Sequence, residues 1–215
     1  MRYRTVVRPV PLLVAVAAAL AGTCAMAGDP PADPHAHHHM MMMESSNKQL
    51  RRSEIAYKVP DLPLVRDDGK PVRLPQELDD GRVVVLNFIY TTCTTICPLT
   101  SQVFGVLQEK LGADRARVHL VSLSIDPEQD TPARLREYAK RYHAGPGWQH
   151  YTGTVQASNA AQQAFATYRG DKMNHEPVTL VRLAPGAAWI RLDGFASADD
   201  LLAEIHGSHP AEAAH

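Results

Sequence analysis

Apolar and polar residues follow two kinds of spacing in the central part of the chain, and each kind predicts a different element. Short runs that are apolar throughout, or that alternate with polar residues, predict β-strands. Such runs cover residues 83–90, 118–125, 178–183 and 188–192. The first of them, VVVLNFIY, has almost no polar position, which is typical of a strand buried on both faces of a sheet.

Helical spacing occurs between these strands. One helix is predicted by four residues that share a face at intervals of three and four: Leu135, Tyr138, Ala139 and Tyr142. Thr131 and Pro132 precede this face and provide an N-cap and a first-turn proline. Three further helices are predicted. One begins near Pro98 and another begins at Ser197. The third, between them, includes Ala161, Phe165 and Tyr168 and ends at Gly170.

A hairpin is expected ahead of the first long strand. Residues 62–74 form two short runs around Asp68 and Gly69, a dipeptide that favours a tight hairpin turn. Strands and helices then alternate, and no segment is repeated. The chain is therefore expected to form one α/β domain, with helices flanking a mixed central sheet and the hairpin as an N-terminal extension.

The first 27 residues have the composition of an export signal. Three arginines precede an apolar run over residues 10–21, and Ala25 and Ala27 form a small-residue cleavage site. The run is shorter than the roughly 20 apolar residues that span a bilayer, although it could extend to residue 27 as an uncleaved anchor. We therefore expect an exported protein in the periplasm or another extracytoplasmic compartment, either released or anchored to the inner membrane.

Charge and cysteine content narrow the function classes. Removal of the signal would leave 19 of the 22 basic residues against 23 acidic residues, a net charge of −4. Nucleic-acid-binding proteins usually carry a net positive charge with clustered basic residues. Because the mature chain would be acidic, no nucleic-acid partner is expected. Cys24 would be removed with the signal, which leaves Cys93 and Cys97. An oxidising compartment permits a disulfide, but a domain of this length can bury a sufficient core without one.

Residues 28–54 are expected to form a disordered linker, because they show no apolar periodicity. Candidate copper ligands are concentrated in it: His35, His37, His38, His39, Met40, Met41, Met42 and Met43. Imidazole binds copper in either oxidation state and thioethers favour Cu(I). A low-complexity tract without a metal role is the alternative. The folded domain is then expected over residues 55–207, followed by a flexible tail at 208–215.

Cys93 and Cys97 stand where the buried strand 83–90 ends and the helix near Pro98 begins. Ligands and reactive groups gather at the carboxyl ends of strands in such sheets. The free N–H groups and the dipole at a helix start also stabilise a thiolate. A spacing of four residues puts both sulfurs on one side of a turn, where they could form a disulfide or bind one metal ion.

Several segments together resemble the Sco/SenC family: TTCTTICP after an apolar strand, SIDPEQDTPARLREYAKRY, GWQHYTG, and a histidine ahead of a later strand. The resemblance extends over roughly residues 55–206. Members of this family are thioredoxin-fold copper proteins that assist the assembly of cytochrome c oxidase. The resemblance therefore implies a thioredoxin-like fold and copper bound by Cys93, Cys97 and His175.

The donor set is consistent with that implication. Two thiolates and one imidazole suit Cu(I) and are acceptable for Cu(II), whereas structural zinc usually has four protein ligands. The resemblance implies a partner, the copper-binding subunit of cytochrome c oxidase. Other periplasmic copper chaperones and thioredoxin-like reductants are further candidates. The leading hypothesis is a metallochaperone that delivers copper to the binuclear copper site of the oxidase, and not an enzyme.

The residues around the histidine depart from the family pattern. Family members commonly have an aspartate where this chain has Asn174, so a carboxylate that could orient a metal ligand is missing. Pro177 occupies a place similar to that of the cis proline of thioredoxin-like reductases. Met173 is expected to be a packing residue and not an additional soft ligand.

The main alternative function is a thiol–disulfide oxidoreductase that reduces acceptor cysteines before metallation. The C-x-x-x-C spacing of this chain differs from the C-x-x-C of thioredoxins and argues against this function. The expected fold and Pro177 argue for it. A peroxidase is less well supported because Tyr90 occupies the proline position of peroxiredoxins, and a purely structural disulfide is the weakest alternative. His119, His143 and His150 have no partner at metal-ligand spacing and are expected to be structural or solvated.

Overall fold

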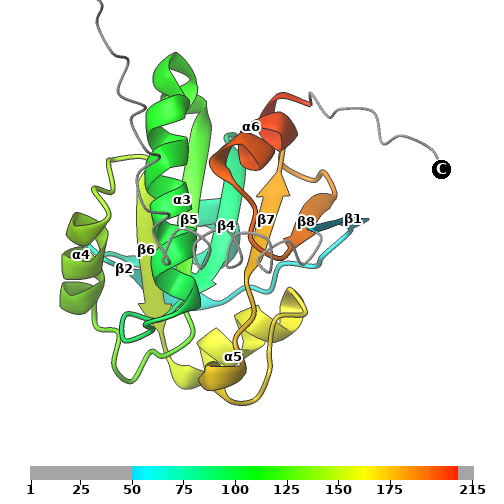
Figure 1. Ribbon diagram of the computed structural model, residues 1–215. Coiled ribbons are helices and arrows are strands. Elements are labelled where there is room, and N and C mark those ends of the chain that lie inside the picture. The colour runs from blue at the N-terminus through cyan, green and yellow to red at the C-terminus, as the bar shows by residue number, and fades with distance from the viewer. Residues whose placement is uncertain (1–49, 208–215) are drawn as a thin grey trace, which may run out of the picture. The chain divides into compact units, whose positions relative to one another are not determined.

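Strand β4 (Val83–Ile89) lies at the centre of an eight-stranded sheet, as its apolar sequence predicts. The computed structural model describes residues 50–207 and shows the sheet with helices on both faces (Figure 1). The other strands are β1 (Arg51–Ile55), β2 (Pro63–Arg66), β3 (Pro71–Arg73), β5 (Val118–Ser124), β6 (Trp148–Gly153), β7 (Val178–Arg182) and β8 (Trp189–Asp193). The helices are α2 (Leu74–Leu78), α3 (Ile96–Lys110), α4 (Pro132–Arg141), α5 (Val155–Ala164) and α6 (Ala198–His206), with 3-10 turns η1 (Gly112–Arg117) and η2 (Lys172–Asn174).

The order of the strands determines which loops meet. The sheet has the order β1-β8-β7-β4-β5-β6-β2-β3. Strand β4 is parallel to β5 and antiparallel to β7, with Asn87 opposite Thr179. Because paired antiparallel strands run in opposite directions, the carboxyl end of β4 lies beside the amino end of β7. The segment after Ile89 and the segment before Val178 are therefore neighbours.

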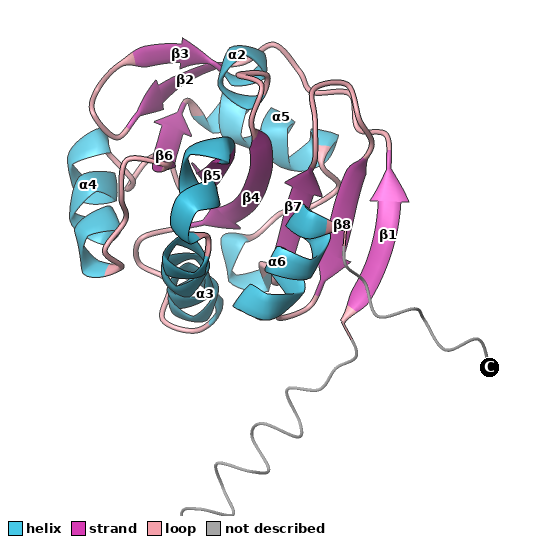
Figure 2. Cartoon of the chain, turned by 90° about the horizontal axis from the view of Figure 1, so that it is seen from above, coloured by secondary structure: helices cyan, strands magenta, loops and turns pink. Residues whose placement is uncertain are grey.

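Alternate residues of β4 face different helical layers. Figure 2 shows α3 and α6 on one face of the sheet and α2 and α5 on the other. Val85 is buried in a cluster with apolar side chains of α3 and α6. Val84 and Leu86 are buried in the cluster that includes residues of α2 and α5. Burial of apolar surface on both faces of β4 is the main driving force for this arrangement.

Most predicted elements are confirmed. Strands β4, β5, β7 and β8 begin and end within one residue of the predicted ranges. Strands β2 and β3 form the predicted hairpin, and β2 also pairs with β6, so the hairpin extends the sheet at one edge. The predicted helix caps are present: the side chain of Thr131 accepts the N–H of Arg134, and the side chain of Ser197 accepts the N–H of Asp200.

The third helix, α5, lies earlier in the chain than predicted. Its first turn is capped by Thr154, whose side chain accepts the N–H of Ala157. The helix ends at Ala164, so Tyr168 lies beyond it. Ala166 adopts a left-handed backbone conformation with φ of 53° and ends the helix, a role that the sequence had assigned to Gly170.

Strand β1 was not predicted, and it corrects the expected start of the ordered domain. Its first four residues fall within the segment 28–54, which was expected to be a disordered linker. The strand pairs antiparallel with β8 along its whole length. It was missed because the sequence RRSEI is mostly polar and forms a strand only through this long-range pairing.

The structure describes only part of the predicted organisation. The expected signal (1–27), the His/Met tract and the expected tail (208–215) lie outside the described residues. Within residues 50–207, no helix is long and apolar enough to cross a membrane.

Candidate metal centre

Cys93 and Cys97 occupy the loop and the first helical turn that follow β4. Only 8% of Cys93 and 0% of Cys97 is exposed, and neither forms a disulfide. The backbone N–H of Cys97 donates to Cys93 Sγ, with an N–S distance of 3.4 Å. One of the unsatisfied N–H groups at the start of α3 is therefore directed at the first cysteine.

The two thiols differ in how readily they ionise. Burial acts to raise the pKa of Cys93, but the backbone N–H groups of Cys97 and Thr95 outweigh burial and the pKa falls to about 7. Burial raises the pKa of the Cys97 thiol, and the negative charge of Cys93 raises it further. Cys93 is therefore the thiol that ionises first.

A buried carboxylate fixes the start of the cysteine loop. Asp130 is fully buried just ahead of α4. It accepts the N–H of Thr91 at 3.2 Å and the Thr91 hydroxyl at 2.6 Å. It also accepts the hydroxyl of Ser124, at the end of β5, at 2.6 Å. These bonds join the loop before Cys93 to the neighbouring strand.

Helix α4 also positions the first turn of α3. The hydroxyl of Tyr138 donates to the backbone carbonyl of Cys97 at 3.2 Å and shares a hydrogen bond of 2.7 Å with the hydroxyl of Ser101. Tyr138 is 1% exposed, so this hydroxyl reaches α3 through the core. The cysteine pair is thus held on both sides, by Asp130 through the loop and by Tyr138 through the helix.

His175 lies immediately before β7, beside the last residue that leaves β4. Its ring centroid is 6.5 Å from that of Tyr90, in an edge-to-face arrangement. Burial lowers the pKa of His175, although a hydrogen bond from the ring to the backbone of Phe88 acts in the opposite direction. The imidazole is therefore held neutral, which is the form that binds metals.

The structure brings the two cysteines together but does not place His175 at ligand distance from them. Among residues 50–207, no group of three His, Cys, Asp or Glu side chains is close enough to hold a metal ion. Tyr90, 6% exposed, contacts both parts of the site. Its backbone carbonyl accepts the N–H of Cys93 at 3.1 Å, and its ring faces His175. A three-ligand centre requires the His175 segment to approach the cysteine loop.

Sequence reasoning misjudged Met173, two residues before His175. Its side chain is 71% exposed, so it is not a packing residue. The hydroxyl of Tyr90 donates to Met173 Sδ, with an O–S distance of 3.8 Å. Sequence reasoning also missed Tyr90, whose only signal was its position three residues before Cys93.

His119, His143 and His150 are not part of the candidate site; His150 packs edge-to-face on Tyr138, with ring centroids 6.1 Å apart. His119 and His150 are 1% and 0% exposed, and His143 is an exposed loop residue, which confirms that they are structural or solvated. No cis peptide bond occurs in residues 50–207, so Pro177 does not share the geometry of the reductase proline. The histidines and methionines at 35–43 lie outside the described residues.

Fold and site together define a class. A mixed sheet covered by helices on both faces carries a cysteine pair between the end of its central strand and the start of a helix. These are the features of thioredoxin-like proteins that use paired thiols. Residues 52–200 match the SCO1/SenC family. The match covers more than half of the chain, and the protein belongs to this family.

Individual relatives agree with this assignment. The chain is 36% identical over 110 residues to the SCO1 protein homolog of Bacillus subtilis (strain 168), a match that covers 51% of this chain and 56% of the relative. The chain thus spans little more than half the length of that curated relative.

Two solved structures share the fold. One concerns a disulfide switch in BsSco, a member of the Sco family of cytochrome c oxidase assembly proteins; it is 27% identical, with a TM-score of 0.60 over 72% of this chain and 95% of that one. The other is Arabidopsis thaliana ScoI with copper bound, at 24% identity and a TM-score of 0.56 over 69% of this chain and 94% of that one.

Proposed function

We propose that this protein is a copper metallochaperone that holds copper through Cys93, Cys97 and His175 and delivers it to the binuclear copper site of cytochrome c oxidase. The observation that carries the proposal is a pair of buried cysteines joined by an N–H···S hydrogen bond, with a neutral imidazole on the adjoining segment, in a member of the SCO1/SenC family. Copper is cargo in this proposal and not a resident cofactor.

The chemistry of the donors fits this cargo. Two thiolates and an imidazole are soft to borderline ligands that suit Cu(I) and accept Cu(II). Each thiol releases its proton when it binds the metal, and Cys93 does so most readily because the N–H of Cys97 stabilises its thiolate. Oxidation of the two thiols to a disulfide, with transfer of two electrons to a partner disulfide, would remove both sulfur ligands and release the metal.

Partners and location are part of the proposal. The BsSco structure concerns a member of a family of cytochrome c oxidase assembly proteins, and the Arabidopsis structure contains copper. These relatives support the copper-binding subunit of the oxidase as acceptor, with periplasmic copper chaperones or thioredoxin-like reductants as further partners. The composition of residues 1–27 supports export to the periplasm. The imidazoles and thioethers of the His/Met tract are proposed as a weak auxiliary copper site.

The test is an anaerobic Cu(I) titration of the reduced full-length chain against a chromophoric chelator. The histidines and methionines at 35–43 are replaced in the background variant so that only the domain site is measured. We expect one tight equivalent, which is lost in Cys93→Ser and Cys97→Ser and weakened at least about tenfold in His175→Ala, because each substitution removes one ligand.

His143→Ala is the matched control, because His143 is an exposed loop histidine far from the site in the chain. It should leave the Cu(I) affinity unchanged. An affinity that does not depend on either cysteine would contradict the proposal. An affinity that depends on both cysteines but not on His175 would limit the proposed site to the thiol pair.

A thiol–disulfide oxidoreductase is the second candidate, and the asymmetry of the cysteines favours it. Cys93 is the more exposed thiol and receives the helix N–H, whereas Cys97 is fully buried. If the loop opened, the less deeply buried thiolate of Cys93 could attack an acceptor disulfide, and the Cys97 thiol could then resolve the mixed disulfide. Rapid reduction of a peptide disulfide by the metal-free dithiol, combined with weak Cu(I) binding, would favour this function over the first.

A further inference from the structure

Both thiols of the proposed site are inaccessible in the structure. Cys93 is 8% exposed and Cys97 is 0% exposed. A metal ion passes between two proteins by ligand exchange, in which a donor from each protein binds the ion at the same time. Such exchange requires a soft donor that a partner can reach, and neither cysteine meets this requirement.

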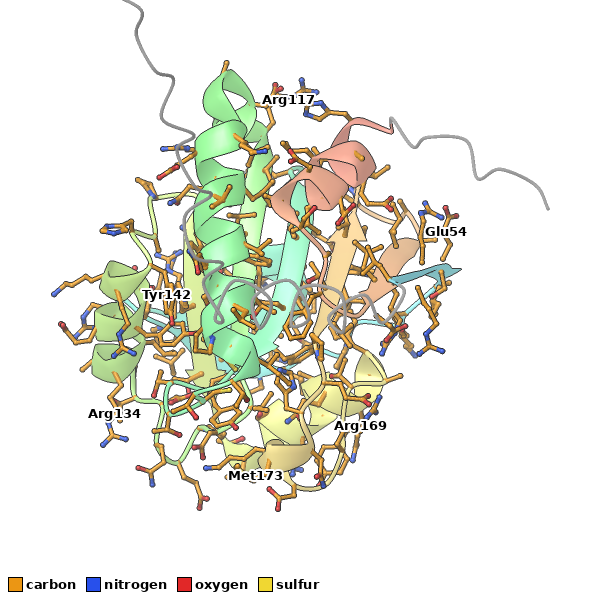
Figure 3. All side chains as sticks on the ribbon, in the orientation of Figure 1. Glu54, Arg117, Arg134, Tyr142, Arg169 and Met173 are labelled. Atoms are coloured by element: carbon orange, nitrogen blue, oxygen red, sulfur yellow. The ribbon has the colours of Figure 1, made fainter. Side chains whose placement is uncertain are left out.

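Met173 does meet it. Its side chain is 71% exposed, the largest exposed fraction among the exposed large apolar side chains of residues 50–207. Figure 3 shows it at the periphery of the molecule. It is also the only methionine in residues 50–207. A thioether is a soft ligand that favours Cu(I), whereas exposure of so much apolar surface gives no stability.

The position of Met173 is fixed on two sides. Its backbone N–H donates to Asp171 Oδ1 at 2.9 Å, which orders the turn η2. Its sulfur accepts the hydroxyl of Tyr90 at 3.8 Å. The backbone carbonyl of Tyr90 accepts the N–H of Cys93 at 3.1 Å, so a single buried residue, Tyr90, contacts both the exposed sulfur of Met173 and the residue that carries the first buried sulfur.

The positive charge of Lys172, the residue before Met173, is paired with a carboxylate. The ammonium group of Lys172 lies 5.7 Å from the ring centroid of Tyr90. It is paired with a carboxylate oxygen of Asp126 at 2.5 Å. The carboxylate, 8% exposed in its side chain, balances the charge of the ammonium group. The charge of Lys172, the residue before Met173, is therefore balanced within the structure.

We propose that Met173 is the entry and exit ligand of the copper site: its thioether binds Cu(I) transiently at the surface and passes it to Cys93 beneath Tyr90. This inference rests on the proposed function. On entry, a Cu–Sδ bond forms as one bond between the ion and its donor breaks. A bond to the Cys93 thiolate then replaces the Cu–Sδ bond, and the thiol proton leaves to water. Copper remains Cu(I) throughout, and delivery follows the same steps in reverse.

The test measures rates and equilibria separately, on the reduced full-length chain under anaerobic conditions. Cu(I)–bicinchoninate is the donor, and its absorbance is followed by stopped flow. Met173→Leu keeps the size and apolar character of the side chain but removes the sulfur. We expect it to slow both uptake and release about tenfold while the equilibrium distribution of Cu(I) changes less than threefold, because a transient ligand affects both directions equally.

A double variant tests whether the position of the exposed thioether matters. Leu183 is 40% exposed and belongs to the loop after β7, so Met173→Leu combined with Leu183→Met restores the number of exposed thioethers at another place. The rate should stay slow in this double variant. The series is repeated with Met40, Met41, Met42 and Met43 replaced by leucine, and the tenfold effect should persist.

The outcomes separate this inference from the proposed function. Unchanged rates in Met173→Leu, or recovery in the double variant, would overturn the entry role while the cysteine variants could still establish the binding site. A tenfold loss of affinity with an unchanged uptake rate would also overturn it, since Met173 would then be a permanent ligand. If neither cysteine is needed for binding, the proposed function itself fails.

Discussion

Asp130 combines a structural role with an electrostatic cost. It joins Thr91, near the cysteines, to Ser124 through short hydrogen bonds, yet it is completely buried. Burial raises the pKa of its carboxyl above the ordinary value. An ionised carboxylate in this position is stabilised less by its three donors than it would be by water. The loop that presents the thiols is therefore held by a group whose charge opposes folding.

This cost predicts a pH dependence of stability. Because the pKa of Asp130 is raised on folding, its contribution to stability is fully present below the ordinary aspartate pKa of about 4 and is lost as the pH rises through the folded-state value. Urea unfolding between pH 4 and 7 should show the free energy of unfolding of the wild type falling with pH relative to that of Asp130→Asn. Parallel curves for the two proteins would contradict the prediction.

The turn that follows helix α5 contains a residue whose backbone conformation is costly. Ala166 has a φ of 53° and is exposed, and a side chain with a Cβ is strained there by about 1 kcal/mol. Glycine adopts this conformation without strain, although it loses more backbone entropy on folding. Ala166→Gly should therefore raise the free energy of unfolding by about 0.5 kcal/mol.

Ala160 provides a control of opposite sign. It lies inside α5, where glycine costs about 1 kcal/mol relative to alanine. Ala160→Gly should lower the free energy of unfolding by that amount, and urea denaturation measures both variants. If both substitutions destabilised the protein, the end of α5 would be held by side-chain contacts of Ala166 and not limited by its backbone.

The same element shows why part of the fold could be predicted from sequence. Strands such as β4 were found because their apolar runs do not depend on neighbours. The end of α5 was not predicted, because tertiary contacts impose the positive φ of Ala166, and an alanine in the sequence does not indicate such a conformation. The cysteine pair followed from its spacing. The roles of Tyr90 and Met173 could not be predicted, because they depend on the register of β4 against β7.

On the scale of the whole molecule, β1 forms one edge of the sheet. It pairs with β8 over five residues, and Arg52 forms an ion pair at 3.0 Å with the buried Glu204 of α6. Tyr57, just after the strand, packs against Phe165 with ring centroids 5.4 Å apart. A strand that lies mostly outside the expected domain boundary, together with the segment just after it, thus contacts β8, α6 and the end of α5.

Two truncations test how much this strand contributes. Removal of residues 1–49 should leave the free energy of unfolding of the domain unchanged. Removal of residues 1–56 should lower it by about 2–3 kcal/mol, since each cross-strand pair contributes roughly 0.2–1 kcal/mol and the ion pair is lost as well. Urea denaturation of the two shortened proteins measures the difference, and equal midpoints would show that β1 adds nothing.

The separation of His175 from the cysteines by Tyr90 has a consequence for affinity. If the proposed ligands are correct, the resting protein is not preorganised for its cargo, and part of the binding energy is spent on drawing the histidine segment inward. The same energy is recovered when the metal leaves. A rigid, fully assembled centre would hold copper more tightly and release it more slowly. An incompletely assembled centre would bind copper less tightly but exchange it faster, which is the combination that a carrier requires.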